Sequence, residues 1–144
     1  MWVWAVVLIL LATVVALWWV RRRYVVVRVD GPSMTPSYLD GDLVLVRRAA
    51  TVARGQVVAF IPRFAPGVTP SAKGGRLWLL KRVAAAPGDP VPPDLGPALL
   101  DRAGQPVPDD AFVAVGDNRE DSRDSRHDGL VGLDRVRGVV VRKL

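Results

Sequence analysis

The first twenty residues of the chain form an unbroken apolar segment. Residues 2–20 carry no charged side chain, and Thr13 is the only polar one among them. As a helix that rises 1.5 Å per residue, this segment is about 28 Å long, close to the hydrocarbon thickness of a bilayer. Four of the five tryptophans lie at its two ends, where their rings suit the membrane interface. The pattern predicts one transmembrane anchor over residues 2–20.

A cleaved secretory signal is the alternative interpretation of this segment. Such a signal begins with basic residues and ends in small ones, whereas this segment ends with two tryptophans and a valine, which favours a retained anchor. Its orientation is less simple, because Arg21, Arg22 and Arg23 follow directly and the positive-inside rule would keep the rest of the chain in the cytoplasm. Either basic residues are missing upstream, or these arginines lie against anionic headgroups on the outer side.

After the anchor, short apolar runs alternate with turn-forming Gly, Pro and Asp residues. This pattern is typical of strands in an antiparallel sheet, so we expect a mainly β fold. The expected architecture is a compact, coiled antiparallel sheet or barrel, formed as one domain over residues 24–144. We expect surface loops over residues 64–75 and 87–111, and a short hairpin within residues 95–106 of the second loop. The predicted strands cover residues 24–29, 42–46, 56–61, 76–83, 111–115 and 136–141.

Composition excludes several kinds of site. The chain has no cysteine and one histidine, so neither a disulfide framework nor a thiolate metal site is available, and no metal or cofactor is expected. His127 lies in a polar turn and is expected to be a solvated loop residue. The net charge of +6 suggests an anionic partner, but the arginines are scattered and no nucleic-acid-binding motif accompanies them. Anionic lipid explains the charge more simply, and no nucleic acid partner is expected.

Lys81 has apolar neighbours on both sides in the sequence. Residues 77–80 and 83–86 are all apolar, and Arg82 is the one charged neighbour. Lowering a lysine pKa from about 10.4 to about 7–8 requires roughly 4 kcal/mol, which an apolar pocket can supply. A neutral amine could then remove the proton of a serine hydroxyl, such as that of Ser33. Viewed alone, however, a solvated lysine and a turn serine are more ordinary interpretations, so the prediction depends on the motifs as a set.

Four motifs follow the anchor in a consistent order. They are Gly31-Pro32-Ser33-Met34-Thr35-Pro36, Gly41-Asp42-Leu43-Val44, Lys81-Arg82-Val83-Ala84-Ala85-Ala86-Pro87-Gly88-Asp89, and residues 116–126 with Gly-Asp-Asn-Arg and Ser-Arg-Asp-Ser-Arg. The set resembles the type I signal peptidases, membrane-bound Ser-Lys endopeptidases that remove leader peptides from exported proteins. Two positions depart from that family. Gly31 stands where some relatives have serine, and Ser37 stands where threonine is usual.

The resemblance implies roles for individual residues. Ser33 would be the acylated nucleophile, Lys81 the base, and Ser122 the hydroxyl that orients the lysine amine. The backbone N–H of Ser33 would stabilise the oxyanion, while Gly31 leaves the second donor open. Carboxylate–guanidinium pairs would support the loop that presents Ser122. The residues expected to form these pairs are Arg82, Asp117, Asp124 and Arg126.

The resemblance also implies how substrate binds. The peptide would add as a strand between residues 25–32 and residues 78–81, with small side chains at positions −3 and −1 relative to the cut. Exported preproteins would be the substrates, at the extracytoplasmic side of a cell membrane, despite the arginines at residues 21–23. The alternatives are a specialised leader or conjugation-type Ser-Lys peptidase with a dedicated substrate, and an inactive membrane-anchored β module. A soluble self-cleaving repressor is disfavoured by the anchor. The residues expected to contact substrate are Gly31, Pro32, Met34, Trp78, Leu79 and Leu80.

Overall fold

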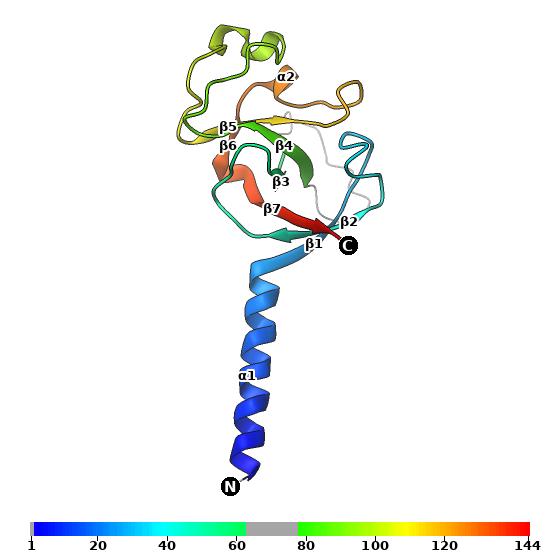
Figure 1. Cartoon of the computed structure of the whole chain (residues 1–144), viewed down its shortest axis with the longest axis vertical. Coiled ribbons are helices and arrows are strands. Elements are labelled where there is room, and N and C mark those ends of the chain that lie inside the picture. The colour runs from blue at the N-terminus through cyan, green and yellow to red at the C-terminus, as the bar shows by residue number, and fades with distance from the viewer. Residues whose placement is uncertain (1, 63–77) are drawn as a thin grey trace, which may run out of the picture.

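A long N-terminal helix projects from a β domain in the computed structural model, which describes residues 2–62 and 78–144 (Figure 1). Helix α1 (Trp2–Arg23) has no buried residue and is apolar all round up to its last turn, as is typical of a helix surrounded by lipid. The hydroxyl of Thr13 donates a hydrogen bond to the carbonyl oxygen of Ile9 at 2.8 Å, so its polar group is satisfied within the helix. Within the described ranges, α1 is the one helix long and apolar enough to cross a membrane, although a signal sequence at this position would share these properties.

The domain is built on one sheet of seven strands, and all neighbouring strands are antiparallel. The order is β1-β2-β7-β3-β4-β5-β6, so the last strand of the chain lies between β2 and β3. In the described residues the sheet is not closed into a barrel, because β1 pairs only with β2, and β6 only with β5. The predicted mainly β fold behind one apolar helix is confirmed, with an open sheet. The strands are β1 (Tyr24–Arg28), β2 (Leu43–Arg47), β3 (Val57–Phe60), β4 (Leu79–Ala85), β5 (Ala111–Val115), β6 (Val131–Gly132) and β7 (Val136–Lys143).

Strand β4 lies at the centre of the packing. It contributes Leu80, Val83 and Ala85, one to each of three apolar clusters. In the cluster that contains Val83, the rings of Phe60 and Phe112 meet edge to face, with their centroids 5.9 Å apart. Side chains on both faces of β4 are therefore held by apolar neighbours, and the strand is a rigid support for any residue that it carries.

Most predicted strands agree with the structure to within one or two residues. The short elements β6, α2 (Ser125–Asp128) and η2 (Leu133–Arg135) were not predicted, because they are too short to show a hydrophobic period. The predicted loop over residues 64–75, and residues 76–77 of the predicted fourth strand, lie outside the described residues.

The segment between β4 and β5 leaves the sheet as a short excursion. The amide of Val91 donates to the carbonyl oxygen of Gln105 at 2.9 Å, and an isolated bridge joins Pro90 to Pro106. The pairing thus lies at the base of the excursion. Its tip is a 3-10 helix, η1 (Pro97–Arg102), instead of the hairpin predicted within residues 95–106. A proline at the start of η1 favours a helical turn, and Leu99 on that turn is buried in the third apolar cluster.

Candidate active site

Lys81 is almost completely buried in β4, with an exposed fraction of 3 %. Val58 of β3 is its cross-strand neighbour. Burial lowers the pKa of Lys81 below its ordinary value, and the negative charge of Asp124 opposes this effect only in part. Removal from water disfavours the ammonium form because the charge loses its hydration. Strand β4 therefore carries an amine that becomes neutral at a lower pH than a solvated lysine does.

The amine of Lys81 begins a chain of buried hydrogen bonds. Its Nζ donates to Oγ of Ser122 at 3.0 Å, and the Ser122 hydroxyl donates to Oδ2 of Asp124 at 2.7 Å. Ser122 and Asp124 are both buried. An ionised carboxylate can only accept hydrogen bonds, so the proton of Ser122 points to Asp124 and the serine oxygen is left to accept from the lysine. The direction of the chain is therefore set by the carboxylate.

Asp124 is held in place by three groups besides Ser122. Its Oδ2 accepts from the amide of Gly116 at 2.8 Å and from Nη2 of Arg126 at 2.8 Å. Its Oδ1 accepts from Nε of Arg126 at 2.8 Å and from the backbone amide of the same residue, which caps α2. Burial raises the pKa of Asp124, but the hydrogen bonds from Arg126, Gly116 and Ser122 outweigh it and hold the pKa far below the usual range. The carboxylate therefore stays ionised at physiological pH.

Arg126 and Asp124 form one ion pair at the end of the loop that follows β5 and carries Ser122. A second ion pair joins the beginning of this loop to β4. Arg82 binds Asp117 with two parallel hydrogen bonds of 2.8 and 2.7 Å, from Nε and Nη2. Its Nη1 also donates to the carbonyl oxygen of Gly55 at 2.9 Å. Burial raises the pKa of Asp117, but the hydrogen bonds from Arg82 and Ser37 have the larger combined effect, and the pKa lies below its usual value. Arg82 follows Lys81 directly in the sequence. The two hydrogen bonds between Arg82 and Asp117 therefore fix the position of the Ser122 loop relative to Lys81.

Ser33 lies in the turn between β1 and β2, and this turn is held from two sides. On one side, the amide of Gly31, whose φ is +83°, donates to Oδ1 of Asp40 at 2.9 Å. On the other side, the backbone amide of Asn118 donates to the carbonyl oxygen of Ser33 at 3.1 Å, and its side-chain amide donates to the carbonyl oxygen of Pro32 at 3.2 Å. The loop that presents Ser122 is thus hydrogen-bonded to the turn that presents Ser33.

Gly116 is where these parts meet. A β-carbon placed on Gly116 would lie 2.1 Å from Oγ of Ser122 and 2.6 Å from the carbonyl oxygen of Ser33. Both distances are far shorter than van der Waals contact, so the close approach of the two segments requires a residue without a side chain. The structure therefore gathers the turn of Ser33, the hydroxyl of Ser122 and the amine of Lys81 in one region.

Comparison with protein families decides the class of this protein. The family model described as signal peptidase, peptidase S26, matches residues 1–95 and 94–144, which together span the whole chain. The chain belongs to the signal peptidase family. No curated protein matches the chain. Membership in the signal peptidase family supports a peptidase and implies exported preproteins as substrates, and the apolar helix α1 is compatible with membrane anchoring.

In this member of the family, the edges of two strands that flank the predicted site are unpaired within the described residues. Strand β4 pairs with β3 from Leu79 to Arg82, but on its other side β5 begins to pair only at Arg82. Strand β1 pairs with β2 on one side only. These are the edges on which the predicted peptide strand would add. Leu79 is partly exposed at the first of them, while Leu80 is buried, with Trp78 packed against the same cluster.

The other predicted substrate contacts differ in exposure. Pro32 is exposed and Gly31 partly so. Met34 is 1 % exposed and packs into the cluster that contains Leu80, where it holds the Ser33 turn against the core. Its contact with substrate stays a prediction.

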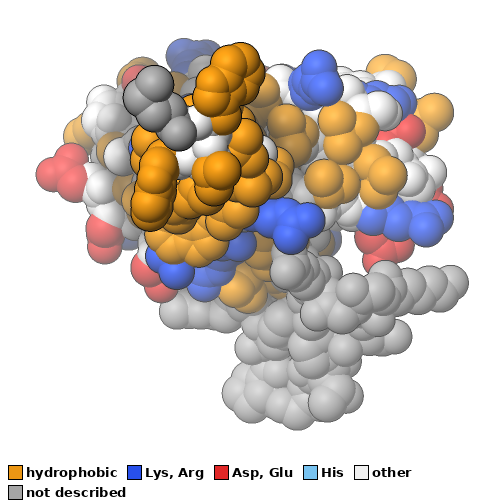
Figure 2. All heavy atoms as spheres, turned by 90° about the horizontal axis from the view of Figure 1, so that it is seen from below, with side chains coloured by type: hydrophobic (Ala, Val, Ile, Leu, Met, Phe, Trp, Pro, Cys, Tyr) orange, Lys and Arg blue, Asp and Glu red, His pale blue; other side chains and the backbone are white. Residues whose placement is uncertain are grey.

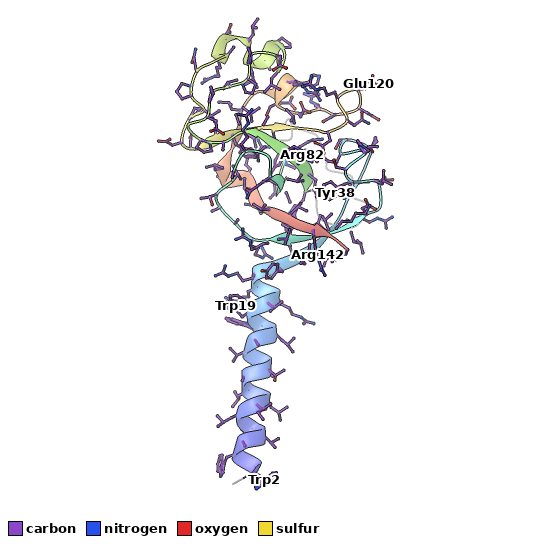
Figure 3. All side chains as sticks on the ribbon, in the orientation of Figure 1. Trp2, Trp19, Tyr38, Arg82, Glu120 and Arg142 are labelled. Carbon is purple, nitrogen blue, oxygen red and sulfur yellow. The ribbon has the colours of Figure 1, made fainter. Side chains whose placement is uncertain are left out.

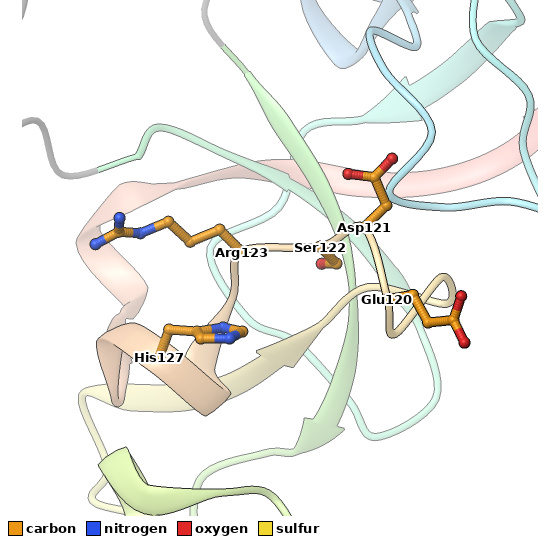
Figure 4. Close-up of a pocket in the computed structure, with 5 residues that line it drawn as sticks. All are labelled: Glu120, Asp121, Ser122, Arg123 and His127. Carbon is orange, nitrogen blue, oxygen red and sulfur yellow. The ribbon is translucent and has the colours of Figure 1, made fainter.

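A pocket open to solvent borders the site, with a volume of about 420 Å³. Figure 4 shows Ser122 in its centre, with two acidic side chains on one side and Arg123 and His127 on the other. Neither Ser33 nor Lys81 lines it, so the pocket adjoins the hydrogen-bonded chain and does not contain it. His127 is exposed, as predicted, but it lies in the short helix α2 and not in the predicted loop. In the described parts of the chain, no cluster of His, Cys, Asp or Glu could hold a metal ion.

Sequence reasoning missed three residues that shape this region. Asn118 belongs to the fourth motif, but the sequence does not indicate that its side chain bridges two segments that are 86 residues apart. Gly116 was recognised as part of a motif, but nothing in the sequence indicates which atoms approach it. Asp40 belongs to a recognisable Asp-Gly turn, and only the fold directs its carboxylate to the amide of Gly31.

Proposed function

We propose that this protein is a membrane-anchored serine endopeptidase that removes signal peptides from exported preproteins, with Ser33 as nucleophile and Lys81 as base. One observation carries the proposal. The amine of Lys81 is removed from solvent and is hydrogen-bonded to the hydroxyl of Ser122. Its lowered pKa makes the neutral form accessible, and a neutral amine can accept a proton from a serine.

Ser122 would leave the lone pair of the amine available for Ser33. A neutral lysine amine has two N–H bonds and one lone pair, and one N–H is used by Oγ of Ser122. Because Asp124 holds the proton of Ser122, this hydroxyl cannot donate to the amine and compete for its lone pair. Ser122 and Asp124 are therefore positioning residues in this proposal, and Lys81 is the group that moves the proton.

Acylation would proceed in two steps. Lys81 takes the proton from Oγ of Ser33 while that oxygen attacks the carbonyl carbon of the scissile peptide bond. The backbone N–H of Ser33 stabilises the negative oxygen of the tetrahedral intermediate. The lysine ammonium then gives its proton to the leaving nitrogen, which frees the mature protein and leaves the signal peptide as an ester on Ser33.

Deacylation uses the same base a second time. The neutral amine of Lys81 takes a proton from water, and the resulting hydroxide adds to the ester carbonyl. When the second tetrahedral intermediate collapses, the proton returns to Oγ of Ser33 and the signal peptide leaves as a carboxylic acid. One water is consumed, and both residues return to their starting states.

The substrate would bind as an added strand. The unpaired edge of β4 over residues 79–81 leads directly to Lys81, and β1 leads towards the turn of Ser33. Main-chain hydrogen bonds to these edges would place small side chains at positions −3 and −1 in shallow pockets. Since α1 continues directly into β1, the site would stay near the surface of the membrane, on its extracytoplasmic side.

The full chain, reconstituted in lipid vesicles with a model preprotein, tests this function. We expect one cut after small residues at −3 and −1, located by mass spectrometry of both products. Ser33→Ala should abolish cleavage, while Thr35→Ala, in the same turn, should retain it. Cleavage by Ser33→Ala at the normal rate would contradict the proposal. An inert β module would cut nothing and would not react with a serine-acylating inhibitor.

A further inference from the structure

The strands nearest the helix have one face that the described chain leaves open. Side chains alternate along a strand, so Val27, Val44 and Val46 point into the core and are buried. On the other side, Val26 is 49 % and Val141 is 52 % exposed. We call this side the basal face. The pairing of β2 with β7 is irregular between Leu45 and Val46, which allows the consecutive Val141 and Arg142 to lie on the same side. The basal face consists of Val26, Arg28, Leu43, Leu45, Arg47, Val141 and Arg142.

Arginines are interleaved with the apolar residues of the basal face. Leu45 pairs with Val26 on one side and with Arg142 on the other, while Arg28 lies opposite Leu43. Directly opposite residues of an antiparallel pair share one face. The face itself contains no acidic residue, so it is both apolar and positively charged.

The acidic residues of the whole chain are also unevenly distributed, and most of them lie far from the basal face in the sequence. Residues 1–29 and 43–88 contain no acidic residue, and eleven of the fourteen acidic residues lie between positions 89 and 134. Figure 3 shows Arg142 at the end of the domain next to the helix, and Glu120 near the opposite end. The positive end is therefore the one that faces a membrane entered by α1.

The basal face is joined closely to the end of the helix. Strand β1 follows α1 without a linker, and the amide of Arg48 donates to the carbonyl oxygen of Arg23 at 2.9 Å. The guanidinium of Arg22 lies 4.2 Å above the ring of Trp18, a pairing suited to the headgroup layer. Seen along α1, hydrophobic and basic side chains lie next to the helix, and the acidic side chains in this view lie towards its edges (Figure 2).

We propose that the basal face binds the anionic phospholipid headgroups of the bilayer that α1 enters. The proposal rests on the membrane anchor of the proposed function, and it adds a preference for one lipid charge. Apolar side chains favour the membrane interface, and each arginine near an anionic surface strengthens binding by about fivefold. Docking would set the height of the Ser33 turn above the lipid, and the same headgroups would hold Arg21–Arg23 on the outer side.

The chain has no cysteine, so a single introduced cysteine can be labelled with a fluorophore at a chosen position of the full chain. A fluorophore on Val26→Cys is compared with one on Leu100→Cys, which is 64 % exposed on η1. Both proteins are reconstituted in phosphatidylcholine vesicles with or without phosphatidylglycerol, and a lipid-borne quencher is added. We expect strong quenching of the Val26 label in the vesicles with phosphatidylglycerol, weaker quenching in neutral vesicles, and none of the Leu100 label. Val141→Cys repeats the test if Val26→Cys does not fold.

Charge variants test the cause. Arg47→Gln/Arg142→Gln should lower the ratio of docked to undocked protein by about 25-fold in phosphatidylglycerol vesicles. Arg102→Gln/Arg119→Gln removes the same charge from the acidic segment and should leave the ratio unchanged. Equal quenching in neutral and anionic vesicles, or no quenching of the Val26 label in either, would overturn the proposal. Cleavage of a soluble peptide in detergent is measured in parallel, so a loss of proteolysis with docking intact would count against the proposed function alone.

Discussion

Replacement of Gly116 by alanine tests whether the site depends on close approach of its parts. The added β-carbon would lie 2.1 Å from Oγ of Ser122 and 2.6 Å from the carbonyl oxygen of Ser33. The φ of Gly116 is not positive, so alanine adds a steric clash without backbone strain. The carbonyl of Ser33 belongs to a turn held by hydrogen bonds and cannot rotate away freely. Overpacking of this kind lowers the free energy of unfolding by about 1–3 kcal/mol.

The larger effect is expected on turnover. To make room, the Ser33 turn and Ser122 must move apart, and the 3.0 Å hydrogen bond from Lys81 to Ser122 would lengthen or break. A displacement of about 1 Å between reacting groups reduces the rate by roughly 100-fold. We therefore expect kcat of Gly116→Ala to fall by about two orders of magnitude while KM changes little.

Gly138→Ala is the matched control. Its β-carbon would lie 2.4 Å from the carbonyl oxygen of Arg47, a comparable clash between β7 and β2, and its φ is not positive either. It should lower the melting temperature similarly but leave kcat of the folded enzyme unchanged. Both variants are assayed on a soluble peptide in detergent, below their melting temperatures. Normal kcat in Gly116→Ala, or an equal loss in both variants, would refute the reasoning.

Four further outcomes follow from the buried amine and its supports. Activity should rise with pH through the lowered pKa of Lys81, because the neutral amine is the active form, and a flat profile would contradict this. Lys81→Met should be inactive yet melt at a higher temperature at neutral pH. Between the lowered pKa and the ordinary 10.5 the folded state binds fewer protons than the unfolded state, so the gain should disappear above about pH 10.5. Ser122→Ala should lower kcat by about 100-fold with little change in KM, and an unchanged kcat would remove Ser122 from the mechanism. Asn118→Ala should lower kcat by about fivefold through loss of one hydrogen bond to the Ser33 turn, and an unaltered kcat would show that this bond does not position the nucleophile.

Local sequence patterns predicted the features that depend on neighbouring residues. The apolar run around Lys81 indicated a buried strand, and burial of this lysine follows from it. The alternation of valines indicated the strands near the helix. Such patterns act over a few residues, and the sheet then decides which strands become neighbours.

Contacts between distant segments could not be predicted in this way. The hydrogen bonds from Asn118 to the Ser33 turn arise because the loop after β5 crosses the turn between β1 and β2. The burial of Met34 also depends on the fold, because its side chain packs against residues from several strands. The basal face also emerges only from the register of β1, β2 and β7, which brings arginines from three segments onto one surface.

Trapping of the acyl-enzyme tests the central claim most directly. The full chain in detergent is treated with a serine-acylating inhibitor over a range of pH, and the modified residue is mapped by mass spectrometry. The account predicts one acyl group on Ser33, a rate that increases with pH, loss of labelling in Lys81→Ala, and normal labelling in Lys143→Ala. Acylation at another residue, or labelling of Lys81→Ala at the rate of the unmodified protein, would contradict it.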